Sequence, residues 1–240
     1  MTTHPTALAA WVQSHPRNHT IDGHGFKLNI GKWNGMAAQL PGTPLLGEDG
    51  GTEIGLISRG GLFGLAAAAR EDESGVAALH LFWQSLAWGT GTNHRNTPGR
   101  IASINAAPIR AASLLRNAAQ LAVHDPKAAF LLLQPGRYPA LKSWGPNFFT
   151  KYLYFAGAGA VGHPSLIVDA RVLATLFKET GKPVFQPRST NYPVGTYLAA
   201  IEVMKAWAAE LSSAERTVGA DEVERWAFGA GEGWRKRQAP

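Results

Sequence analysis

Two residues whose types could do covalent chemistry lie close together in the second half of the chain. Lys151 is embedded in an apolar, aromatic stretch, and Asp169 follows 18 positions later. A lysine amine becomes a nucleophile when burial or a neighbouring cation keeps it neutral, and a carboxylate stabilises positive charge that develops beside it. The same two residues also have a purely structural interpretation, as a solvated lysine and an aspartate at the start of a helix.

The segments around the pair predict two helices joined by a loop. A turn at Gly145-Pro146 leads into a stretch bearing Lys151, which is compatible with helix or strand by periodicity over 148–156. A glycine-rich loop follows, and 168–172 begins a second helix with Asp169 in its first turn. Two helices would deliver both side chains rigidly to one place.

The motifs Thr150-Lys151 and 168–172, which reads V-D-A-R-V, resemble a known family. They are similar to the 8-oxoguanine glycosylase branch of the helix-hairpin-helix DNA glycosylases, in which a hairpin ends in Thr-Lys or Gly-x-Lys before Val-Asp-x-His/Arg-Val. The resemblance implies that Lys151 is the amine nucleophile and Asp169 the catalytic carboxylate. It also implies a mainly α-helical fold of two lobes with a DNA cleft between them. It covers 76–228 and leaves 1–65 unassigned.

A second stretch, 81–93, reads L-F-W-Q-S-L-A-W-G-T-G-T-N and extends the resemblance. It is similar to the first helix of the glycosylase domain, which this family follows with a loop that probes DNA. The resemblance implies that Asn93, His94 and Arg95 fill the gap left by a flipped nucleotide, because the glycosidic bond is inaccessible inside the base stack.

The hairpin itself departs from the family pattern. Where the family has Leu-Pro-Gly-Val-Gly, whose backbone holds a monovalent cation and a DNA phosphate, this chain has G-P-N-F-F over 145–149. The loss of the glycines argues against a bound cation. The resemblance still implies that Gly145, Asn147 and Thr150 contact DNA, and that Arg171 contacts a phosphate.

Charge and composition limit the partners. The 240 residues include 23 basic and 17 acidic side chains, a formal charge of +6 that favours a polyanion such as DNA. There is no cysteine, which excludes disulfides, zinc–thiolate sites and cysteine-held iron–sulfur clusters. We predict no metal and no cofactor. No stretch approaches the roughly 20 apolar residues of a membrane span. We expect a cytoplasmic, monomeric, single-domain protein that does not contact membranes.

Helical patterns dominate the rest of the chain, and long alternating strand patterns are absent. Proline in a first turn and an N-cap before proline predict helices from 107–123 and after Asp125. A last helix is expected over 221–228, and loops over 41–61 and 89–99. Apolar residues at helical spacing predict two amphipathic helices: Val76, Leu79, Trp83 and Leu86 in one, and Tyr197, Ile201, Met204, Ala208 and Leu211 in the other.

One motif favours a different class of enzyme. The glycines of 157–162 match G-x-G-x-x-G, which would bind a dinucleotide if a strand preceded it. His163-Pro164 follows at once, and no acidic residue stands at the expected distance. A helix before the loop would exclude this interpretation.

The function predicted from these motifs is that of a DNA glycosylase. The enzyme would flip a modified base out of double-stranded DNA and excise it, leaving an abasic site. Candidate substrates are 8-oxoguanine and hypermodified pyrimidines of phage DNA, such as glucosylated hydroxymethylcytosine, because some bacterial members with these motifs resemble phage-defence enzymes. Lys151 would form a Schiff base and support lyase activity, or Asp169 would activate water. The alternative is a non-catalytic helical DNA-binding module of the same fold.

Overall fold

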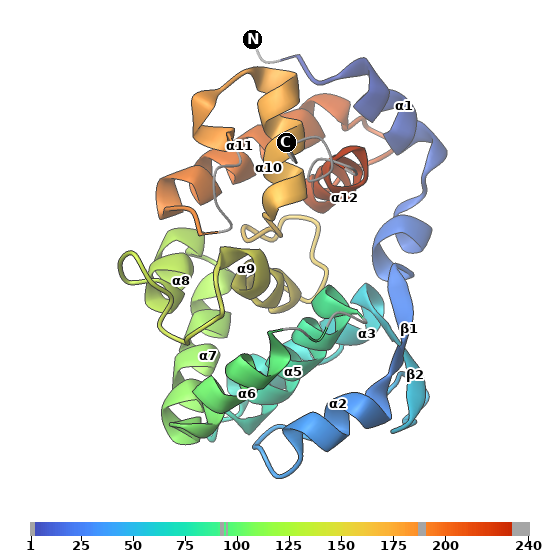
Figure 1. Cartoon of the computed structure of the whole chain (residues 1–240). Helices are drawn as coiled ribbons and strands as arrows, with labels where there is room; N and C mark the ends of the chain where they lie inside the picture. The colour runs from blue at the N-terminus through green and yellow to red at the C-terminus, as the bar shows by residue number, and fades with distance from the viewer. Residues whose placement is uncertain (1–2, 92–93, 95, 187–190, 232–240) are drawn as a thin grey trace, which may run out of the picture.

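The computed structural model describes residues 3–91, 94, 96–186 and 191–231, and over these ranges the chain is mainly α-helical (Figure 1). This confirms the prediction of a mainly α-helical fold. The elements are α1 Thr6–Ser14, a π-helical turn Asn18–Asp22, β1 Gly25–Asn29, α2 Ile30–Ala37, β2 Ile54–Ser58, α3 Arg59–Phe63, α4 Ala66–Glu71, α5 Val76–Thr90, α6 Thr97–Asn105, α7 Pro108–Ala122, α8 Pro126–Leu133, α9 Pro146–Phe155, α10 Ala170–Thr180, a 3-10 turn Pro183–Phe185, α11 Val194–Leu211 and α12 Ala220–Ala230. None of the described helices is long and apolar enough to span a bilayer.

Helix α5 is a largely buried helix whose C-terminal end forms part of the site. It packs against α4, α7, α9 and the small sheet, and Leu79, Trp83 and Leu86 are buried as their spacing predicts. Val76, the first of the four apolar residues predicted to share one face of this helix (the apolar stripe), is 44% exposed instead. Residues off the stripe, from Leu81 to Trp88, are buried as well, because neighbouring elements cover this helix on nearly every side.

Local signals set the starts of the next helices. Proline occupies the first turn of α7, α8 and α9, where its missing N–H costs no intrahelical bond. Asp125 caps α8 by accepting a hydrogen bond from the Ala128 N–H at 2.9 Å. The predicted helices over 107–123 and after Asp125 are therefore confirmed. The stretch 148–156, which periodicity left open, lies almost entirely in helix α9.

Two loop predictions need correction. Residues 54–58, inside the predicted loop 41–61, form strand β2, which pairs antiparallel with β1 so that Lys27 faces Leu56. Ile54 and Leu56 point outward and Gly55 inward, so the strand lacks the alternation of polar and apolar residues that would reveal it. The predicted loop 89–99 is also shorter, because α5 continues to Thr90 and α6 starts at Thr97.

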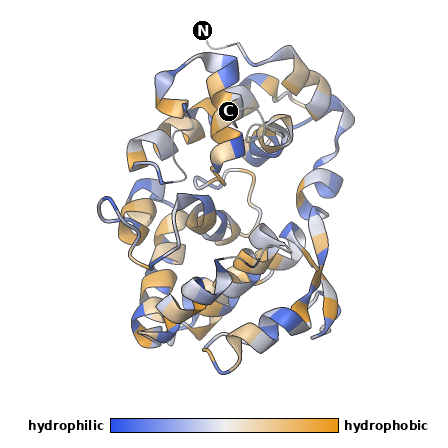
Figure 2. Cartoon of the chain, in the orientation of Figure 1, coloured by the Kyte–Doolittle hydropathy of each residue, from blue (hydrophilic) through white to orange (hydrophobic). Residues whose placement is uncertain are grey.

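The C-terminal helices pack on one another and on the N-terminal segment. Helix α12 contacts α10, α11 and α1. In α11, four of the five predicted core positions are buried and Leu211 is half-buried against the core, which confirms that amphipathic helix. Along α2, hydrophobic and hydrophilic residues alternate in the pattern of a helix with one buried face (Figure 2).

Candidate active site

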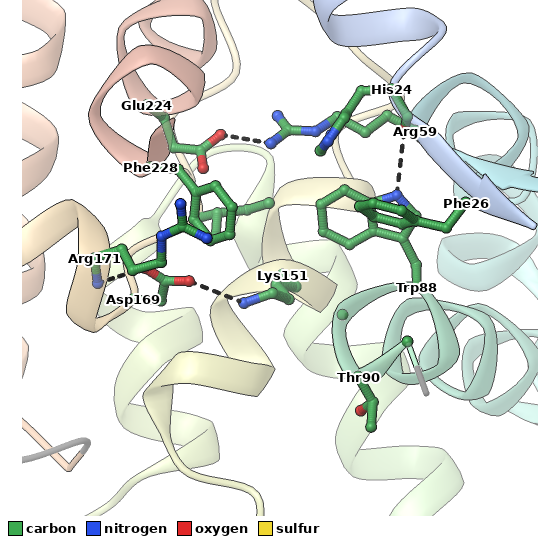
Figure 3. Close-up of a pocket in the computed structure, with 13 residues that line it drawn as sticks. His24, Phe26, Arg59, Trp88, Thr90, Lys151, Asp169, Arg171, Glu224 and Phe228 are labelled. Atoms are coloured by element: carbon green, nitrogen blue, oxygen red, sulfur yellow. Dashed lines mark hydrogen bonds and ion pairs between the residues drawn. The ribbon is translucent and has the colours of Figure 1, made fainter. Parts of the chain in front are cut away.

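A pocket of about 340 Å³ forms where segments far apart in the chain come together (Figure 3). The pocket is formed by the end of α5, the starts of β1, α3 and α10, the middle of α9 and one face of α12. Both residues singled out from the sequence line this pocket. Its lining is His24, Phe26, Arg59, Trp88, Gly89, Thr90, Gly91, Lys151, Ile167, Asp169, Arg171, Glu224 and Phe228.

The side chain of Thr150 ties the lysine segment to the aspartate segment. Its hydroxyl donates to the Pro146 carbonyl at 2.7 Å and accepts from the Val168 N–H at 3.3 Å. Thr150 precedes Lys151 and Val168 precedes Asp169, so this contact joins the neighbours of both residues. The Thr150 side chain is fully buried, and a DNA contact through it is not available in this conformation.

Asp169 is the N-cap of α10, one position before the first turn in which the sequence placed it. Its Oδ1 accepts hydrogen bonds from the N–H groups of Arg171 at 2.9 Å and Val172 at 3.2 Å. The positive end of the helix dipole favours negative charge at this position. The second oxygen, Oδ2, faces the amine of Lys151 at 3.7 Å. One carboxylate therefore both caps a helix and forms part of the pocket.

Lys151 is 7% exposed, which excludes the interpretation of a solvated surface lysine. Its amine donates to the Asn147 carbonyl at 2.7 Å. Burial lowers the pKa of Lys151, while the negative charges of Asp169 and Glu224 oppose that shift and the cation of Arg59 assists it. The net direction is downward, toward the neutral amine that nucleophilic chemistry requires.

Gly89 leaves the space that the lysine side chain occupies. A Cβ added at Gly89 would lie 2.7 Å from Cδ and 3.0 Å from Cε of Lys151. This explains a glycine near the end of α5, in the A-W-G-T-G motif. The next glycine, Gly91, caps the same helix with a φ of +58°, a conformation that favours glycine.

Two charged residues of the pocket were not singled out from the sequence. Arg59 and Glu224 are each 1% exposed, and Arg59 Nη2 donates to Glu224 Oε2 at 2.9 Å. Burial raises the pKa of Glu224, and Arg59 opposes that shift. Burial also disfavours the charge of Arg59, but Glu224 and Tyr154 more than compensate and raise its pKa. The sequence does indicate that Glu224 and Phe228, four residues apart in a predicted helix, lie on one helix face. It gives no comparable signal for Arg59, which follows a strand that the sequence analysis did not recognise.

Aromatic rings form much of the remaining wall. The ring of His24 makes edge contacts with Phe26 at 5.2 Å and Trp88 at 5.4 Å between centroids. Burial, assisted by the cations Arg59 and Arg225, lowers the pKa of His24 to about 3, so its imidazole is neutral at physiological pH. Across the pocket, the Arg171 guanidinium lies 3.9 Å from the centre of the Phe228 ring.

The predicted DNA-contacting residues that the structure describes belong to different segments of the chain, and of these only Arg171 lines the pocket. Asn93 and Arg95 lie outside the described residues. His94 is half-buried, with its ring 5.0 Å from that of Trp33. Gly145 and Asn147 are half-buried at the N-terminal end of α9, about one turn before Lys151. Their contact with DNA, and that of Arg171, remain predictions.

A further cation beside the start of α9, Arg100, was not singled out from the sequence. It follows the predicted loop 89–99 directly and lies in α6. Arg100 is 4% exposed; its Nε donates to the Ser143 carbonyl at 3.2 Å, and its guanidinium lies 3.7 Å from the centre of the Phe148 ring. Burial lowers its pKa to about 10, which leaves it charged at neutral pH. Among the described residues, no carboxylate pairs with it.

The glycine-rich loop does not form a dinucleotide site. Helix α9, not a strand, precedes it, which excludes the nicotinamide-dependent alternative. A Cβ at Gly157 would overlap the ring of His163, and His163 Nε2 lies 2.9 Å from the Leu153 carbonyl. Gly157 thus allows the chain to pack tightly over a buried histidine. Within the described ranges, no group of three or more acidic or histidine side chains could hold a metal.

A helical fold with a buried lysine facing an N-capping aspartate is the arrangement expected of a DNA glycosylase of this type. Over residues 19–228 the chain matches the model of a family described as "Putative 8-oxoguanine DNA glycosylase OGG-like protein". The protein therefore belongs to this OGG-like family, which indicates a glycosylase type of activity with DNA as the partner. The match begins at residue 19 and includes most of the part that the motifs left unassigned. Comparisons with curated proteins and with solved structures gave no match.

The contact between Gly89 and Lys151 predicts a specific loss of stability. Gly89→Ala should lower the free energy of unfolding by about 1–3 kcal/mol, because the added methyl must displace the buried lysine stem. Gly35→Ala, also within a helix but with no atom within 4 Å of the added Cβ, should raise it by up to about 1 kcal/mol. Urea unfolding of both variants measures the difference. Equal stability of Gly89→Ala and wild type would contradict the packing described.

Proposed function

We propose that this protein is a DNA glycosylase that draws a modified base into the pocket and cleaves its glycosidic bond with Asp169. The observation that carries the proposal is the amine–carboxylate pair, with 3.7 Å between Lys151 Nζ and Asp169 Oδ2, buried in a pocket of a chain that belongs to the OGG-like family. DNA would lie in a cleft between two helical lobes, with the target nucleotide rotated out of the stack.

The pair supports two routes of cleavage. In the first, the Lys151 amine forms a bond to C1′ while the bonding electrons of the glycosidic bond leave with the base, which takes up a proton. The sugar ring then opens to a Schiff base, and lyase chemistry follows. In the second, Asp169 accepts a proton from a water whose oxygen bonds to C1′, while the base leaves with the electrons of the glycosidic bond and takes up a proton. In both routes the carboxylate stabilises the positive charge that develops on the sugar.

The aromatic lining supports base binding. Phe26, Trp88 and Phe228 line the same pocket as the lysine and give it an aromatic surface suited to a planar heterocycle. The substrates proposed are 8-oxoguanine and hypermodified pyrimidines of phage DNA, such as glucosylated hydroxymethylcytosine. If the substrate is a modified base of phage DNA, the protein would act in antiphage defence. We also propose that it acts in the cytoplasm and as a monomer.

The hairpin and α6 support contact with the DNA backbone. Gly145, the N-cap residue of α9, provides no side-chain cap, and the first turn of the helix has no acidic residue, so the positive end of the helix dipole favours an anion there. Arg100 adds a positive charge to the same region, with its guanidinium over the ring of Phe148 in that first turn. We propose that this region holds a DNA phosphate.

Asp169→Asn tests the catalytic carboxylate without removing the helix cap. Asparagine caps helices as well as aspartate does, so the fold should persist while the charge is lost. We expect at least about 100-fold slower release of the base from an 8-oxoguanine duplex or from phage DNA with modified cytosines, whichever the wild type cleaves. Abasic sites are counted after each incubation. Equal rates of cleavage for variant and wild type would exclude Asp169 as the catalytic carboxylate, and no cleavage by either protein would favour the non-catalytic DNA-binding module.

Lys151→Gln separates the two routes of cleavage. If the amine attacks C1′, borohydride should trap a covalent adduct between wild type and a DNA substrate, and the variant should form none. Incubation of the same DNA without borohydride measures excision by both proteins. Excision by the wild type with no trapped adduct would remove Lys151 as nucleophile and leave water activation by Asp169.

Arg100→Met tests the phosphate contact through its dependence on salt. Loss of one phosphate contact should reduce the slope of log affinity against log salt by about 0.9, whereas Arg100→Lys should keep most of it. Fluorescence anisotropy with a duplex measures the slope. Lys178→Met removes an exposed cation near the far end of α10 and should leave the slope unchanged. An unchanged slope in Arg100→Met would exclude the contact.

A further inference from the structure

The pocket holds a second carboxylate in addition to that of Asp169. Glu224 of α12 lines the same pocket as Lys151, and its charge acts on the lysine amine. Charges interact strongly where little water separates them. A carboxylate without another partner at this position would attract the ammonium form of the lysine and compete with Asp169 for it.

Glu224 does have another partner, because Arg59 forms an ion pair with it. The guanidinium donates to Glu224 Oε2 at 2.9 Å and to the Tyr154 hydroxyl oxygen at 3.3 Å. It also lies 5.2 Å from the ring centres of both Trp88 and Tyr154. Figure 3 shows the Arg59–Glu224 pair on one side of the pocket and the Lys151–Asp169 pair on the other.

The arginine is held in place without help from the lysine. Tyr154, which accepts its hydrogen bond, donates in turn to Asp221 Oδ2 at 2.9 Å, and Arg17 pairs with the same carboxylate. Arg59 is therefore the centre of a buried network that joins the N-terminal segment, α9 and α12. The position of Glu224 follows from this network.

We propose that Arg59 is a positioning residue for the lysine: by holding Glu224 in an ion pair, it leaves the Lys151 amine facing Asp169 and available as a neutral nucleophile. The role in catalysis rests on the proposed function, because it requires Lys151 to attack the sugar. The effect on the charge of the amine does not, and it can be measured without DNA.

The direction of each effect follows from the charges that face the lysine. Removing Arg59 frees Glu224 and removes a cation, so both changes should raise the pKa of Lys151. Removing Glu224 leaves Arg59 unpaired and should lower it. His24 is neutral and contributes no charge. The titratable or charged groups of the pocket are His24 beside β1, Arg59 at the start of α3, Asp169 and Arg171 at the start of α10, and Glu224 on α12.

The test is competitive acetylation of the full chain with trace acetic anhydride over a range of pH, with the Lys151 peptide quantified by mass spectrometry. Arg59→Met should shift the midpoint of Lys151 labelling upward by about one unit, an about tenfold loss of labelling at neutral pH. Glu224→Gln should shift it downward. The double variant Arg59→Met/Glu224→Met should lie near the wild type, since an apolar pair replaces the ion pair.

Opposite shifts separate an electrostatic role from a structural one, because loosened packing would move both single variants in the same direction. An unchanged or lowered midpoint in folded Arg59→Met overturns the proposal. If Arg59→Met does not fold, Glu224→Gln decides: a midpoint that stays at the wild-type value overturns it equally. Arg59→Lys, which keeps the charge, should remain near the wild type.

A second measurement keeps the proposed function separate. The same variants are incubated with a duplex containing an abasic site and borohydride, and the covalent adduct is quantified. If Lys151 is the nucleophile, adduct formation at neutral pH should fall in Arg59→Met in parallel with labelling. Expected labelling shifts with no adduct in any protein, wild type included, would support the charge effect of Arg59 and exclude Lys151 as nucleophile.

Discussion

The geometry of the site depends on how one backbone unit, that of Val168, is held. It lies outside any helix, so neither of its polar groups has a partner from regular structure. Side chains supply both: the N–H donates to Thr150 at 3.3 Å, and the carbonyl accepts from the Tyr192 hydroxyl at 2.5 Å. Because Asp169 is the next residue, these two bonds fix where the carboxylate meets the lysine. The N-cap bonds of Asp169 then fix its orientation.

A second constraint comes from the start of α12, which carries three buried carboxylates. Buried charges need partners, and each of these has an arginine from elsewhere in the chain. Asp221 pairs with Arg17, Glu222 with Arg216, and Glu224 with Arg59. Two of the three arginines precede residue 60. The N-terminal segment is therefore part of the site, in agreement with a family match that begins at residue 19.

The sequence predicts those features that depend on neighbouring residues. Prolines in first turns and the N-cap residue Asp125 mark the starts of α7, α8 and α9. An aspartate at a helix start likewise marks α10, which Asp169 caps. Features that depend on contacts between distant segments were not accessible. The need for glycine at position 89 is explained only by the Lys151 side chain that packs against it. The role of Arg59 is explained only by its contact with Glu224 of α12. The strand before Arg59 was not recognised because its first four residues, I-G-L-I, show no alternation of polar and apolar side chains.

The contribution of α12 to the pocket has a consequence for the protein during its synthesis. A nascent chain has made Lys151 and Asp169 well before Glu224 and Phe228 emerge, and until then one wall of the pocket is missing. Arg59 also lacks its carboxylate partner at that stage. An incomplete polypeptide would thus carry Lys151 and Asp169 without the wall that α12 adds to the pocket and without the carboxylate that pairs with Arg59.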